Sequence, residues 1–228
     1  MRDRGRLSVE QLDAAMGLMG REGRRVVLPM RGESMLPMLR AGQLIAVDLS
    51  PFEPELGDLL LFRQQDYLVV HRFLGPASRE DGSPAFRTRG DGLPGLDPAV
   101  ERARVRGRVR AIEDRGRWWS LEGGGARAWA LAVALHDLCW AGAAVVAGRA
   151  DGLLRRVGLR LAVQTWVVRT DRALLGLAHR LLFPAFHRAS AAWPEGYPLA
   201  AAEQLERGRG LGGDGGAQGA LAVGGEER

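Results

Sequence analysis

The 228-residue chain contains no lysine and no asparagine, and it has a single cysteine, Cys139. All 32 of its basic residues are therefore arginines. One cysteine excludes an intrachain disulfide and any cysteine-based metal cluster, and its apolar neighbours predict that Cys139 is buried. The missing lysine removes one of the bases that can activate a serine nucleophile. Glycine is frequent, with 32 residues, and together with abundant Ala, Leu and Arg this is typical of a GC-rich genome.

The net charge and the lack of a long hydrophobic run at the N-terminus narrow the classes of function. The formal net charge is +5 at pH 7, and basic proteins bind phosphates or anionic membrane surfaces. Acidic residues are interspersed with the arginines here and no basic run is long, so we expect no nucleic-acid partner. The start of the chain has charges but no continuous apolar stretch, so we expect neither a secretory signal nor an N-terminal anchor. These features predict a cytoplasmic or peripheral membrane protein.

Residues 1–23 and 24–123 differ in the period of their hydrophobic pattern. A serine followed by apolar residues at helical spacing predicts a short amphipathic helix over residues 8–19. After it, β-type runs alternate with clusters of Pro, Gly, Asp and Ser, which predicts strands separated by turns. The six runs are 24–30, 43–49, 58–63, 67–74, 85–90 and 102–113. We therefore expect a mainly β fold, a compact antiparallel or coiled β domain followed by an α-helical C-terminal extension.

Residues 124–190 form the predicted helical extension, which starts where the composition changes. Residues 128–148 read AWALAVALHDLCWAGAAVVAG and match a membrane span in length. His136 and Asp137 lie at the middle of this stretch, however, and an acidic group is costly at the centre of a bilayer. A membrane-spanning helix is therefore disfavoured here.

The second half of the extension carries charge and apolar residues on different sides. Residues 151–186 have arginine on one side and Leu, Val, Trp and Phe on the other. This pattern suits a helix that lies on a membrane surface or on a partner, and packing on the β domain explains it equally well. A membrane surface is thus one candidate partner for residues 128–183. Residues 191–228 cannot bury a core, and we expect most of them to be disordered.

A serine in the first loop of the predicted β domain is the main candidate for chemistry. Ser34 lies in RGESMLPMLRAG, and a serine hydroxyl is a weak nucleophile until a positioned base takes its proton. Without lysine that base is a histidine, and His71, in YLVVHRF, is the histidine of the β domain. Asp91 and Asp97 follow in TRGDGLPGLDP. Each is a candidate to orient the imidazole, and each also fits a turn-forming role beside glycine.

The order of these motifs resembles that of the signal peptidase I superfamily. The matching stretches are GESMLPMLRAGQLIAV, GDLLLF, VVHRF, TRGDGLPGLD and RVRGRVRAI, which run in family order from about Val26 to Ile112. The resemblance is to the branch found in archaea, spore-forming bacteria and the endoplasmic reticulum, in which histidine replaces lysine as the base. It covers about two-fifths of the chain.

The resemblance implies a signal-peptidase-like fold and a serine endopeptidase that cleaves leader or signal-type peptides through an acyl-enzyme. In this family pattern Ser34 is the nucleophile and His71 the general base. Asp97 fixes the imidazole tautomer, as in serine triads generally, and Asp91 braces the loop and the site. The backbone N–H of Ser34 donates to the oxyanion that develops in the transition state.

The resemblance also implies which residues contact the substrate and that the reaction needs no metal or cofactor. Met35 shapes the substrate-binding cleft and Pro37 the turn after the nucleophile. The substrate is a peptide or precursor protein, and neither a metal nor another cofactor is expected. Two alternatives remain: a catalytically degenerate module that binds a peptide or a partner, and a self-cleaving repressor. Repressor peptidases of this superfamily share the GES sequence but use lysine as the base.

Overall fold

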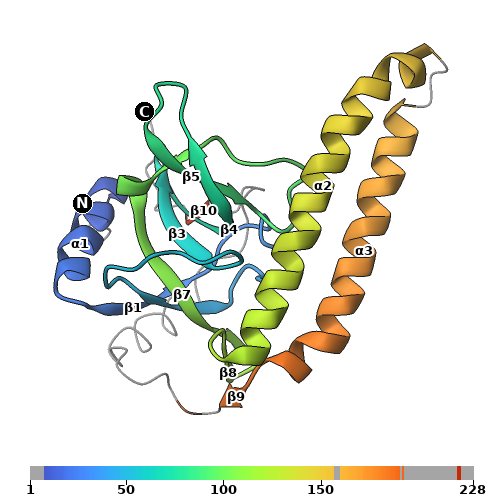
Figure 1. Ribbon diagram of the computed structural model, residues 1–228. Coiled ribbons are helices and arrows are strands. Elements are labelled where there is room, and N and C mark those ends of the chain that lie inside the picture. Colours follow the sequence, from blue (N-terminus) through green and yellow to red (C-terminus); the bar gives the residue numbers. More distant parts are fainter. Residues whose placement is uncertain (1–7, 157–159, 191, 193–219, 222–228) are drawn as a thin grey trace, which may run out of the picture.

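Strands from the first half of the chain pair into one antiparallel sheet, and two long helices lie against it (Figure 1). The structure is a computed structural model that describes residues 8–156, 160–190, 192 and 220–221. The elements in chain order are α1 (Val9–Arg21), β1 (Arg25–Pro29), β2 (Leu44–Asp48), β3 (Leu59–Gln64), β4 (Tyr67–Ser78), β5 (Pro84–Arg89), β6 (Val100–Glu101), the 3-10 turn η1 (Arg102–Arg104), β7 (Val105–Asp114), β8 (Arg117–Ser120), α2 (Gly124–Arg156), α3 (Arg160–Phe186), β9 (Ala189–Ser190) and β10 (Ala220–Leu221).

The sheet is ordered β1-β2-β7-β3-β4-β5-β6, and each of these neighbours is antiparallel. β8 extends the sheet from β7, β9 pairs with β8, and β10 pairs with β4. The six predicted runs correspond to β1, β2, β3, β4, β5 and β7, so these strand predictions are confirmed. The fold is a mostly antiparallel β-sheet with a few helices. The predicted disorder of 191–228 falls almost entirely outside the described residues.

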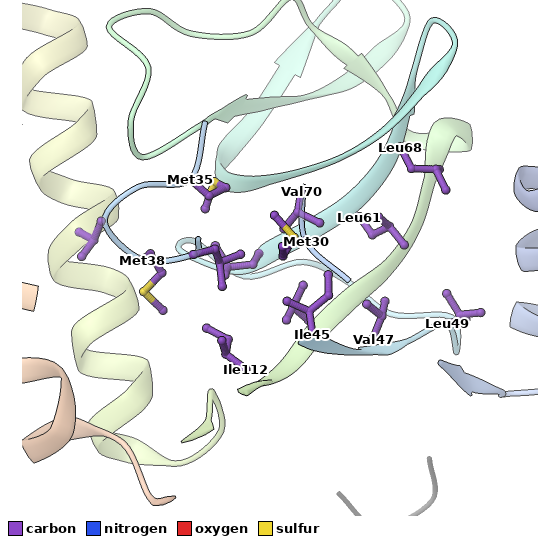
Figure 2. Packing of buried hydrophobic residues seen from close by; sticks show 14 of the residues in the cluster. Met30, Met35, Met38, Ile45, Val47, Leu49, Leu61, Leu68, Val70 and Ile112 are labelled. Carbon is purple, nitrogen blue, oxygen red and sulfur yellow. The ribbon is translucent and has the colours of Figure 1, made fainter. Parts of the chain in front are cut away.

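Successive side chains of β4 point alternately into the main core and toward the face that carries Ser34 and His71. Leu68 and Val70 are buried in the main hydrophobic cluster, whereas Val69 belongs to a second cluster on the other face. Successive side chains of a strand point to opposite faces, so His71 shares the face of Val69. Figure 2 shows the main cluster, in which Leu61 of β3 and Ile45 of β2 pack near Val70. The sheet therefore buries apolar residues on both faces.

The predicted N-terminal helix is present as α1. Ser8 caps it, because its hydroxyl accepts from the Gln11 N–H at 3.2 Å and the Gln11 side chain accepts from the Ser8 N–H at 2.9 Å. Such a capping box satisfies two backbone donors that the helix leaves unpaired. Met16 packs into the main core with 1% of its surface exposed, and Asp13 binds Arg106 of β7 through two hydrogen bonds of 2.6 and 2.8 Å.

The two long helices belong to the same core as the sheet. α2 and α3 lie side by side along one flank of the molecule (Figure 1). Trp129 and Val133 of α2 and Phe183 of α3 are all buried in the main hydrophobic cluster. The change of composition after residue 123 thus marks the passage from strands to helices, and the buried cluster extends across it.

The outer face of α2 corrects one expectation. Leu131, Leu135 and Cys139 follow one another at intervals of four residues, which places them on one side of the helix. The two leucines are 42% and 49% exposed, and Cys139 is exposed as well. The prediction that this cysteine is buried is therefore wrong. Within the parts of the chain that the structure describes, no helix combines the length and the apolar content required to cross a membrane.

Candidate active site

Ser34 lies in the loop between β1 and β2, which is anchored by methionines. Met30, Met35 and Met38 are 3%, 1% and 6% exposed, and Figure 2 shows their side chains gathered in the core below the loop. The Leu39 N–H donates to the Met35 carbonyl at 2.9 Å, which closes a turn directly after the serine. Met35 therefore holds the loop in place from the core. The cavity beside Ser34 is lined by other side chains, and the expected role of Met35 in the substrate cleft stays a prediction.

His71 reaches Ser34 from β4. Its Nε2 atom lies 3.0 Å from Ser34 Oγ, within hydrogen-bond distance. The imidazole is 3% exposed and packs edge-on against the Phe62 ring of β3, with ring centroids 5.9 Å apart. This packing and the strand position limit the rotation of the ring. The predicted nucleophile and base, separated by 37 positions in the chain, are thus in contact.

Asp97 completes a chain of hydrogen bonds behind the imidazole. Its Oδ2 atom accepts from His71 Nδ1 at 2.7 Å and from Thr88 Oγ1, also at 2.7 Å. The Asp97 N–H donates to the Thr88 carbonyl at 2.9 Å, so the backbone fixes the carboxylate as well. A carboxylate at Nδ1 keeps the proton on that nitrogen and leaves Nε2 free of a proton, as an acceptor for the serine hydroxyl. Thr88 was not singled out from the sequence, because nothing in its local pattern distinguishes it from other strand threonines.

Glycines allow the loop of residues 90–97 to pass directly over Ser34. The Gly92 N–H donates to the Ser34 carbonyl at 2.7 Å. A Cβ atom on Gly90 would lie 2.6 Å from that carbonyl oxygen and 2.9 Å from His71 Nε2. A side chain at position 90 would therefore collide with both partners of the serine contact. Glycine is required here for the close approach of two backbones.

Asp91 points away from the catalytic contact and braces the loop. Its two carboxylate oxygens accept from Arg72 Nε and Nη2 at 2.8 and 2.6 Å, and Arg72 Nη1 also donates to the Gly57 carbonyl at 2.9 Å. Burial disfavours the charged guanidinium, but the Asp91 carboxylate outweighs this and raises the pKa of Arg72 above its ordinary value. Asp91 thus ties the loop to Arg72 of the sheet, and a direct part of Asp91 in catalysis stays a prediction.

A second buried ion pair joins the same loop to α2. Arg89, at the end of β5, donates from Nε to the Leu93 carbonyl at 2.9 Å and from Nη1 to Asp137 Oδ1 at 3.0 Å. Asp137 is fully buried. Burial raises the pKa of the Asp137 carboxyl to about 6, and repulsion from the Asp91 carboxylate acts in the same direction. Asp137, the residue that disfavours a membrane span, is therefore the ion-pair partner of Arg89.

α3 contacts the loop from the cavity side. Arg172 donates to the Gly92 carbonyl, and Gly176 lies against Pro37, 4.0 Å from its Cβ when a Cβ is built on the glycine. Sequence reasoning missed these contributions from Arg172 and Asp137. α3 therefore touches both loops that carry the catalytic candidates, and α2 contacts Arg89 at the end of β5.

Ser34, His71 and Asp97 line a cavity of about 620 Å³. Apolar side chains, Pro37 among them, form part of its wall, and Tyr67 and Val69 of β4 form another part. A cavity of this size accommodates a short peptide segment. Pro37 therefore lies at the cavity wall, and its expected part in substrate binding stays a prediction. In the described part of the chain, no group of three or more His, Cys, Asp or Glu side chains is arranged to hold a metal ion.

The comparisons with known proteins give no match. No protein-family model matches the chain, and no curated protein or solved structure matches it.

Proposed function

We propose that the protein is a serine endopeptidase with a signal-peptidase-like fold that cleaves leader or signal-type peptides through an acyl-enzyme. The observation that carries this proposal is the unbroken chain of contacts from Ser34 Oγ to His71 Nε2 and from His71 Nδ1 to Asp97 Oδ2, at 3.0 and 2.7 Å, on the wall of a cavity. The resemblance of the motif order to the histidine branch of the signal peptidase I superfamily supports the same proposal.

In the proposed reaction His71 acts as the general base. As Ser34 Oγ attacks the substrate carbonyl carbon, its proton passes to His71 Nε2. Asp97 holds the imidazole in the correct tautomer and stabilises the imidazolium that forms, and the Thr88 hydroxyl keeps the carboxylate in position. His71 then gives the proton to the leaving amine, which departs and leaves an ester on Ser34. Water, deprotonated by His71, hydrolyses this ester and restores the free serine.

The test compares cleavage of a complex peptide mixture by the wild-type protein and by variants. Ser34→Ala and His71→Ala should each lower the rate by about 10³-fold or more. The double variant should cost little more, because both residues serve one step. Asp97→Asn should also be severe, since the amide favours the wrong tautomer. Ser83→Ala, in the turn between β4 and β5, is the matched control and should cleave normally.

The design also separates the proposal from its main alternative, a degenerate module that binds a peptide without cutting it. Under that alternative neither the wild-type protein nor Ser34→Ala yields cleavage products, and both retain peptides in a pull-down. Cleavage products that require Ser34 but survive His71→Ala would contradict the triad, because the chain has no lysine to replace the base.

We further propose that α3 contacts a membrane surface. Leu174, Leu177 and Leu181 are 61%, 54% and 67% exposed, and Arg180 lies beside the last of them. Exposed leucines next to arginine on one helix suit the interface of an anionic bilayer. A peptidase held there would meet leader segments at the membrane. Apolar contact with another protein is the alternative, and vesicle binding distinguishes the two.

A further inference from the structure

One edge of β4 is open beside the catalytic residues. β3 pairs with β4 from Tyr67 to Arg72, whereas the ladder with β5 begins only at Arg72. On the side of β4 opposite β3, residues 67–71 therefore have no partner in β5. We call this stretch the open edge of β4. Tyr67, Val69 and His71 alternate along this stretch, and all three line the cavity. The open edge thus borders the proposed catalytic cavity.

A segment near the C-terminus of the same chain occupies this edge. β10 (Ala220–Leu221) pairs with β4 in the antiparallel sense, with Ala220 opposite Val69 and Leu221 opposite Leu68. Figure 1 shows β10 next to β4 on the sheet. Strand addition at an open edge is a general mode of peptide recognition, because the backbone of the added strand forms the hydrogen bonds. The occupant here is a piece of the protein itself.

We propose that this C-terminal segment is a built-in competitor for peptides that bind along the open edge of β4. The pairing is antiparallel and places Ala220 opposite Val69, two positions before His71 on β4, so the occupied edge is the one beside the proposed base. The inference rests on the proposed function only in that the occupied edge borders the proposed catalytic cavity.

The expected strength of the competition follows from the covalent linkage of the segment to its site. The paired segment belongs to the same chain as β4, and covalent linkage of a segment to its site gives an effective concentration on the order of millimolar. A pairing with an intrinsic Kd of about 1 mM then fills the edge half of the time and weakens external peptides about twofold. An intrinsic Kd of about 0.1 mM weakens them about tenfold. Release of the segment should therefore strengthen peptide binding by about two- to tenfold.

The experiment uses proline to prevent the pairing in the full chain. Ala220→Pro/Leu221→Pro removes two consecutive backbone donors, of which one faces the partner strand. Ala202→Pro/Leu205→Pro places the same substitutions elsewhere in the tail and is the matched control. Both are made on Ser34→Ala, so no cleavage intervenes. The probe is a fluorescently labelled peptide with the sequence of residues 216–225, GAQGALAVGG.

Two measurements then decide. Hydrogen exchange of the β4 amides in residues 67–71 should be severalfold faster in Ala220→Pro/Leu221→Pro than in the control, and the probe should bind about two- to tenfold more tightly to it by anisotropy. Equal exchange rates in the two proteins overturn the proposal, as does equal or absent probe binding. Neither measurement depends on proteolysis. If the wild-type protein proves to be no peptidase, the competitor is therefore still tested, and a failed competitor leaves the peptidase assay unaffected.

Discussion

The contact between Ser34 and His71 depends on the absence of a side chain at Gly90, which makes Gly90→Ala a sharp test of the site. The backbone of Gly90 is not in the left-handed region, so alanine meets no conformational penalty there. The added Cβ would lie 2.6 Å from the Ser34 carbonyl oxygen and 2.9 Å from His71 Nε2. Both distances are well inside ordinary van der Waals contact, so at least one partner has to move.

The size of the effect follows from these distances. Relief of the overlap requires shifts of more than about half an ångström, and one of the two obstacles is backbone that cannot rotate away. The Ser34–His71 separation of 3.0 Å should therefore lengthen beyond a good hydrogen bond. A misplacement of about 1 Å in an active site costs about 100-fold in rate, whereas overpacking costs about 1–3 kcal/mol in stability. We expect kcat to fall about 100-fold in a protein that still folds.

The assay is the rate of peptide cleavage, with urea denaturation to confirm folding. Gly95→Ala is the matched control, since it lies in the same loop and a Cβ at this position meets no atom within 4 Å. It should keep the wild-type rate. A Gly90→Ala protein that cleaves as fast as Gly95→Ala would refute the argument that the close approach of this loop sets the geometry of the catalytic pair.

Two further predictions concern the helices. The pKa of Asp137 is raised to about 6 in the folded protein, so its contribution to stability is present below about pH 4 and is lost as pH rises through 6. The free energy of unfolding of the wild type relative to Asp137→Asn should therefore fall by about 1–3 kcal/mol between pH 4 and 7, and a constant difference in urea titrations would contradict this. Leu177→Glu/Leu181→Glu should weaken binding to vesicles that contain phosphatidylglycerol, whereas Leu18→Glu, at a leucine of α1 that is 62% exposed, should not. Equal sedimentation of the two with vesicles would exclude α3 as the contact.

The sequence was most informative where its pattern is local. The short apolar run of YLVVHRF, bounded by turn residues, predicts β4 with His71 on it, and the capping residues predict α1. The association of Ser34, His71 and Asp97 followed from the order of the motifs, not from any local pattern. Cys139 shows the limit of composition, because apolar neighbours along a helix do not reveal which of its faces meets the core.

Contacts between distant segments account for most of what was missed. Asp137 follows His136 in an apolar stretch, and nothing near it in the sequence indicates that its partner is Arg89. Arg172 likewise belongs to an amphipathic pattern that suits a membrane surface, a partner or the sheet equally well. The partners of Asp137 and Arg172 follow only from the way in which α2 and α3 lie on the sheet.

The helices therefore belong to the site although they supply none of its proposed catalytic groups. The loop of residues 90–97 is held by two buried ion pairs, one to Arg72 of the sheet and one between Arg89 and Asp137 of α2. Loss of one partner from a buried pair is costly, about 3–5 kcal/mol, because the remaining charge is left without compensation. A chain cut at the change of composition would remove Asp137 from Arg89 and Trp129 from the core. The loop that carries Asp97 would then lose its support from the helices, so the position of the catalytic carboxylate depends on residues that lie well outside the motifs.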